Sequence, residues 1–201
     1  MGGGLLDLIP AHRGHFAYTS GDHGDLWLDL DALFAHPRRL RPYVTAVADL
    51  LPQCDVVCGP LTGGAYLAQS VADTLDTDFA WTEGRTLTGA VTDRRVAIVD
   101  DAINAGSAVS AAAGAITAAG GQLVAVAALL TLAAAPATIA GVPLRSLATI
   151  QSHLWPPATC PRCAAGAPLS VPPACARYTV RAGTPPSVQR RLSSVGRAIH
   201  S

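Results

Sequence analysis

The sequence contains no lysine, and this absence limits the ways in which the protein can bind anions. All 14 basic residues are therefore arginines, and no run of them is long enough to form a surface for nucleic acid. The charge is also unevenly distributed, because all 14 acidic residues lie at or before Asp101 and seven arginines follow it. We therefore expect no nucleic-acid partner.

The sequence also lacks a segment that could enter a membrane. Its most apolar stretch, residues 123–135, is too short to span a bilayer. Met1 is followed by glycines and Asp7 rather than by the cationic start and apolar core of a secretory signal. These features predict no membrane partner and a cytoplasmic location. Five cysteines in that compartment argue against a disulfide framework.

Half of the 201 residues are hydrophobic, which is enough for one buried core of ordinary size. The most informative stretch is residues 96–120. Its first four residues are apolar and mostly β-branched, which is typical of a buried parallel strand. Asp100 and Asp101 follow, then a turn of small residues at 104–107, then apolar residues from 109 to 116 at helical spacing. The pattern predicts a strand, an acidic turn and a helix.

Such a turn favours a phosphate ligand. The backbone N–H groups of the loop and of the first helical turn have no internal partner, and the helix dipole adds positive potential. Asn104 and Ser107 add side-chain donors, while Asp100 and Asp101 can accept hydrogen bonds from sugar hydroxyls. The stretch therefore predicts a phosphorylated sugar with a vicinal diol. The alternative is an acidic pair that merely caps a helix in another α/β protein.

A second anion-binding loop is predicted at residues 61–64. The short apolar strand at 55–58 leads into Leu61-Thr62-Gly63-Gly64, and a helix with inward apolar residues from 67 to 75 follows. A Gly-Gly pair after a strand is by itself more often a tight turn than a ligand site. Its occurrence about forty residues before the acidic turn strengthens the prediction.

Residues 99–107, Val-Asp-Asp-x-x-x-Ala-Gly-Ser, resemble the phosphoribosyl pyrophosphate (PRPP) signature of type I phosphoribosyltransferases, most closely the orotate version. Asn104 and Ser107 stand where that version commonly has threonines. The resemblance extends over residues 14–130 and implies an α/β fold, with a parallel-sheet core and a small N-terminal hood. We predict a phosphoribosyltransferase-like domain at 1–150, with the hood mainly at 1–35. A Cys/Pro/Arg-rich, partly irregular C-terminal extension covers 151–201.

The resemblance implies transfer of ribose 5-phosphate from PRPP to a pyrimidine base, with orotate as the first choice and pyrophosphate as the leaving group. It assigns catalysis to Asp100 and Asp101, and it assigns base binding to Asn104 and Phe16. The implied PRPP-binding residues are Asp100, Asp101, Ala102, Ile103, Asn104, Ala105, Gly106, Ser107, Ala108, Leu61, Thr62, Gly63, Gly64 and Arg85. Mg²⁺ is implied with PRPP, and a homodimer is implied because relatives complete their sites across one.

Two departures from the family keep alternatives open. Orotate enzymes usually place an arginine after the strand at 123–130, but here the next charge is Arg145, which favours uracil or a purine as the acceptor. The loop between Trp81 and Val96 is short and has no lysine. That loop favours a non-catalytic, PRPP-binding regulatory protein.

Cys160-Pro-Arg-Cys163 resembles half of a zinc knuckle. Zinc usually takes four ligands, and only His153 and Cys175 lie near enough in the sequence to complete a site. We therefore assign no metal ligand and keep Cys160 and Cys163 as candidates for zinc. The alternative is a reduced turn without metal.

Overall fold

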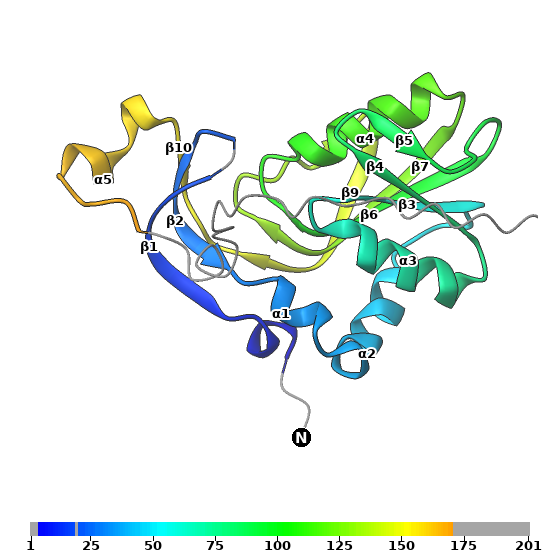
Figure 1. Ribbon diagram of the computed structural model, residues 1–201, viewed down its shortest axis with the longest axis horizontal. Helices are drawn as coiled ribbons and strands as arrows, with labels where there is room; N and C mark the ends of the chain where they lie inside the picture. The colour runs from blue at the N-terminus through cyan, green and yellow to red at the C-terminus, as the bar shows by residue number, and fades with distance from the viewer. Residues whose placement is uncertain (1–3, 19, 171–201) are drawn as a thin grey trace, which may run out of the picture.

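A computed structural model describes residues 4–18 and 20–170 of the chain. Its centre is a seven-stranded sheet in the order β5-β4-β3-β6-β7-β9-β8 (Figure 1). The strands are β3 (Val56–Pro60), β4 (Asp78–Glu83), β5 (Thr86–Thr88), β6 (Arg95–Ile103), β7 (Gln122–Leu132), β8 (Thr138–Ile139) and β9 (Val142–Ile150). The five inner strands are parallel and only the two edge strands, β5 and β8, are antiparallel. The predicted parallel-sheet core is confirmed.

Helices cover both faces of this sheet. Helices α2 (Pro37–Ala48) and α3 (Gly64–Leu75) pack on one face, and α4 (Ser107–Ala118) packs on the other. Successive strand residues alternate between the two cores, so that Val57 and Val99 face α3 while Val56 faces α4. This explains why the inner strands are continuous apolar runs. No helix within residues 4–18 and 20–170 is long and apolar enough to cross a membrane.

Strand β6 is longer than its apolar run of residues 96–99. The ladder to β7 continues past that run, with Asp100 opposite Ala128 and Ala102 opposite Leu130. The two aspartates therefore belong to the strand rather than to the turn that follows it. Because β3 and β6 are parallel neighbours, their carboxyl ends lie at the same edge of the sheet. The loops that follow these strands consequently begin side by side.

A separate three-stranded antiparallel sheet forms the hood, which stands to one side of the central sheet in Figure 1. Its first two strands, β1 (Ala11–Ala17) and β2 (His23–Leu28), form a hairpin. The third strand, β10 (Leu154–Trp155), comes from the segment after residue 150 and pairs with β2. The remaining short elements are η1 (Leu5–Leu8), α1 (Asp31–Phe34), η2 (Pro157–Thr159) and α5 (Pro161–Ala164). The predicted extension from residue 171 onward lies outside the described residues.

Candidate functional site

The two predicted loops meet at the end of β6. Asp100 and Asp101 are both buried there, with 5% and 7% of their surfaces exposed. A Cβ atom on Gly63 would lie 2.6 Å from both carboxylate oxygens of Asp101, and one on Gly64 would lie 2.6 Å from Oδ1 of Asp100. Any larger residue would displace the acidic pair. Glycine at both positions therefore allows one loop to lie directly against the other.

Burial controls the protonation of the acidic pair. Loss of solvation raises the pKa of Asp100 well above its ordinary value, and the neighbouring charge of Asp101 raises it further. Burial also raises the pKa of Asp101, to about 6. Backbone N–H groups partly offset this, because Asp101 N–H donates to Asp100 Oδ1 at 3.0 Å and Ala102 N–H donates to Asp101 Oδ1 at 2.6 Å. A cation or additional hydrogen-bond donors at the pair would stabilise the ionised carboxylates and lower both pKa values.

A small cavity of about 160 Å³ lies beside the start of α4, lined by Asp100 and residues 102–109. Gly106 is the residue before the helix and has φ 79°, a left-handed conformation that favours glycine. The first N–H groups of α4 have no intrahelical acceptor, so they are free to bind an anion in this cavity. The amide oxygen of Asn104 is buried here without a hydrogen-bond partner among the described residues. The geometry suits a phosphate group.

A larger cavity of about 370 Å³ adjoins the first and shares Asp100, Ala102 and Ala108 with it. Its lining combines the hood, through residues 27–31, with Thr62 and the end of β6. Asp29 and Asp31 bring two further carboxylates to this lining. Among the described residues that line the two cavities there is no arginine or histidine. A polyanionic ligand would therefore need a cation to offset these carboxylates.

Five residues of the predicted site line neither cavity: Gly63 and Gly64, which lie against the acidic pair, and Leu61, Phe16 and Arg85. Leu61 is half exposed, and Phe16 is buried in the hood, where its ring packs against Trp27 at a centroid distance of 6.1 Å. Phe16 therefore meets the larger cavity only through Trp27. Arg85 lies in the turn between β4 and β5, and its Nη2 is 4.0 Å from the position of a Cβ on Gly114 of α4. The roles predicted for Phe16 and Arg85 stay predictions.

The two candidate zinc ligands have partners that sequence reasoning missed. Cys160 and Cys163 place their Sγ atoms 3.4 and 3.6 Å from Nε2 of His15, and His23 lies beside them. The residue expected to complete the group, His153, instead places Nδ1 3.1 Å from Oδ2 of Asp25, and Cys175 lies outside the described residues. A histidine on each strand of the hairpin formed by β1 and β2 was the sequence signal for this group.

Comparison with known proteins supports the same fold. No protein-family model matches the chain. The chain is 28% identical over 116 residues to the orotate phosphoribosyltransferase of Methanopyrus kandleri, an alignment that covers 54% of this chain and 63% of that protein. The chain thus spans less than two thirds of the length of this curated relative.

Solved structures extend the match over most of the described chain. The orotate phosphoribosyltransferase of Mycobacterium tuberculosis H37Rv in complex with inorganic phosphate is 25% identical, with a TM-score of 0.59. That match covers 72% of this chain and 90% of the other. The adenine phosphoribosyltransferase of Thermoanaerobacter pseudethanolicus has a TM-score of 0.60 at 17% identity, over 73% and 98% of the two chains. The predicted resemblance in fold is confirmed.

Proposed function

We propose that this chain, which has the type I phosphoribosyltransferase fold, transfers ribose 5-phosphate from PRPP to a nucleobase and releases pyrophosphate. The observation that carries the proposal is the buried pair Asp100 and Asp101. This pair lies against Gly63 and Gly64 and beside the cavity at the start of α4. Two anion-binding loops on either side of an acidic pair match a ligand that carries phosphate groups on both sides of a diol.

Each part of the site then has a role. The cavity lined by residues 102–109 holds the 5-phosphate, and loop 61–64 binds the pyrophosphate through backbone donors. Asp100 and Asp101 accept hydrogen bonds from the ribose hydroxyls. As the bond from C1 to the pyrophosphate oxygen breaks, pyrophosphate leaves with the electron pair, a nitrogen of the base bonds to C1, and the proton of that nitrogen goes to the departing pyrophosphate. The two carboxylates stabilise the positive charge that develops on the ring, which is worth about 3–4 kcal/mol for a well-placed group.

The acidic lining supports a requirement for Mg²⁺. Four carboxylates, those of Asp29, Asp31, Asp100 and Asp101, line the larger cavity, and PRPP itself is a polyanion. Mg²⁺ prefers oxygen ligands and keeps several waters, so the diol and the pyrophosphate oxygens of PRPP are suitable ligands. When bound, the ion neutralises charge on the leaving group.

We further propose a homodimer, because an arginine from a second copy would supply the cation that is missing from the described lining.

We propose orotate as the acceptor base, which would place the reaction in pyrimidine nucleotide biosynthesis. The support is the similarity to curated and solved orotate phosphoribosyltransferases. One observation favours a different base. The first arginine after β7 is Arg145, whose Nη1 donates to the carbonyl of Leu50 at 2.9 Å. It is thus engaged away from the larger cavity. Uracil or adenine, which have no carboxylate, would not need such an arginine.

The test is release of pyrophosphate from PRPP and Mg²⁺ in the presence of orotate, uracil or adenine, each assayed separately. We expect release with one base, and we expect the double variant Asp100→Asn with Asp101→Asn to abolish it. Asp73→Asn, an exposed aspartate on α3, is the matched control and should keep the activity. An active double variant would refute the assignment. Calorimetric binding of PRPP without pyrophosphate release for any base would instead identify a PRPP-binding regulatory protein.

A further inference from the structure

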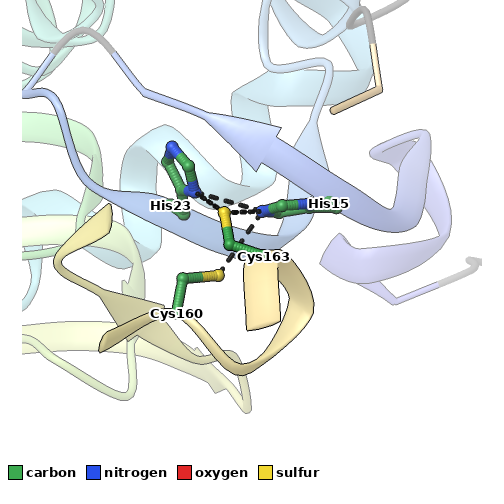
Figure 2. A group of neighbouring side chains, drawn as sticks. All are labelled: His15, His23, Cys160 and Cys163. Atoms are coloured by element: carbon green, nitrogen blue, oxygen red, sulfur yellow. Dashed lines mark hydrogen bonds between the residues drawn. The ribbon is translucent and has the colours of Figure 1, made fainter. Parts of the chain in front are cut away.

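We propose that His15, His23, Cys160 and Cys163 form a structural zinc site that holds the segment after β10 against the hood. Figure 2 shows the four side chains converging from two directions, with the histidines on the hairpin and the cysteines on the turn around α5. None of the four lines either cavity of the proposed transferase site. The site is therefore additional to the catalytic function.

Four of the six distances between ligand atoms are close to those of tetrahedral zinc. His15 Nε2 lies 3.1 Å from His23 Nδ1, and Cys163 Sγ lies 3.2 Å from the same His23 atom. The two sulfurs lie 3.4 and 3.6 Å from His15 Nε2, and all four ligand atoms fall within 4.8 Å of one another. With zinc bonds of about 2.0–2.1 Å to nitrogen and 2.3 Å to sulfur, tetrahedral geometry separates neighbouring ligand atoms by about 3.3–3.8 Å.

Several groups of this cluster approach one nitrogen of His15. His15 Nδ1 lies 2.9 Å from the carbonyl oxygen of Ala167, which can only accept, so Nδ1 carries the proton and Nε2 offers a lone pair. Three potential donors, His23 Nδ1 and both thiols, then approach that single lone pair. A cation at the centre would use one lone pair from each of the four groups. The Ala167 carbonyl would serve as the outer partner that orients a metal-bound imidazole.

Local structure explains how the four atoms come together. Cys160 is the residue before α5 and Cys163 lies in its single turn, so the spacing of three residues puts both sulfurs on one side. The turn is closed by the Ala164 N–H, which donates to the Cys160 carbonyl at 3.1 Å. His15 and His23 lie on adjacent antiparallel strands, and β10 brings the cysteines to the same sheet by pairing with β2. The backbone thus brings the four ligand atoms to one place.

The ligand set identifies the metal and its role. Two imidazoles and two thiolates in tetrahedral geometry favour zinc over magnesium or calcium, which prefer oxygen ligands. Four protein ligands leave no open position for water, which is the arrangement of structural rather than catalytic zinc. His15, His23 and Cys160 are buried while Cys163 is exposed, so one side of the site is accessible to chelators. A closed site at this place would couple metal binding to folding of the hood.

The test begins with the metal content of the full-length protein produced with added zinc and purified without chelator. We expect about one zinc per chain. In cobalt-substituted protein we expect visible bands of tetrahedral Co²⁺ and a thiolate charge-transfer band. Cys160→Ser should reduce the zinc content by more than about tenfold. His153→Gln and Cys175→Ser should retain zinc. His153 Nδ1 lies 3.1 Å from Oδ2 of Asp25, and the four proposed zinc ligands include no cysteine besides Cys160 and Cys163.

A second variant keeps the test decisive if Cys160→Ser fails to fold. Cys163→His preserves four ligands at an exposed position, so it should bind zinc while losing roughly half of the thiolate charge-transfer intensity of the cobalt protein. Chelation of the unmodified protein should also lower its melting temperature. Purified protein without zinc and without a cobalt spectrum would overturn the proposal. So would bound iron in place of zinc, or loss of metal in the His153 or Cys175 control.

Discussion

The acidic pair at the end of β6 predicts a pH-dependent cost to stability in the ligand-free protein. The informative change is Asp101→Asn, which keeps an oxygen to accept from the Ala102 N–H and adds a donor that can face Asp100. Burial raises the pKa of Asp101 from 3.8 to about 6. A difference of about two pKa units corresponds to about 3 kcal/mol between the protonated and ionised forms.

The sign of this effect follows from proton uptake. Because the pKa is higher in the folded state, the folded protein binds more protons than the unfolded chain between about pH 4 and pH 6. Stability is therefore lost as pH rises through this window, and the full cost is present above it. Asp101→Asn removes the titrating group, so it should gain up to about 3 kcal/mol over the unmodified protein at pH 8. The gain should shrink towards zero below pH 4.

Urea denaturation of both proteins at pH 4, 6 and 8 measures this difference directly. Asp73→Asn controls for the loss of one exposed negative charge and should track the unmodified protein at every pH. A difference that does not vary with pH would refute the reasoning, because it would show that Asp101 does not titrate in this window. A destabilised Asp101→Asn variant at pH 8 would also refute it, since the carboxylate would then be well compensated in the ligand-free fold.

The remaining predictions concern the loops and the cation. Gly63→Ala should destabilise the fold by about 1–3 kcal/mol and weaken PRPP binding in calorimetry, because its Cβ would meet both Asp101 carboxylate oxygens at 2.6 Å. The matched Gly114→Ala, inside α4 with its nearest contact at 4.0 Å, should instead stabilise by about 0.5–1 kcal/mol in the same denaturation experiment. Omitting Mg²⁺ from the assay should lower PRPP affinity by at least about tenfold, since four carboxylates line the larger cavity; unchanged affinity would contradict the electrostatic argument.

The central part of the fold could be predicted because its signals are local. The apolar run before Asp100 and the small residues at 104–107 specify a buried strand and the start of a helix, and both occur there. The end of β6 could not be located in this way. The ladder to β7 carries the strand through both aspartates, and that pairing depends on tertiary contacts that the composition of the strand does not reveal.

The partners of the cysteine pair were not predictable by the same local reasoning. His15 and Cys160 are 145 residues apart in the sequence, and they meet only because β10 pairs with β2. At two residues, β10 is too short to show any alternation of apolar and polar residues. The position of Arg85 could not be predicted from the sequence either, because the direction of a long side chain in a turn depends on the helix against which it lies.

The hood is assembled from the two ends of the described chain, and this sets an order of events during synthesis. Trp155 emerges from the ribosome about 130 residues after His23, the residue it will face in the finished sheet. At about 5–20 residues per second, the N-terminal hairpin waits roughly 7–26 seconds for its third strand. By then every strand of the central sheet has already been translated. The hood is thus completed last, so a nascent chain that has emerged from the ribosome only as far as residue 150 would present a complete central sheet beside a hairpin that lacks its third strand.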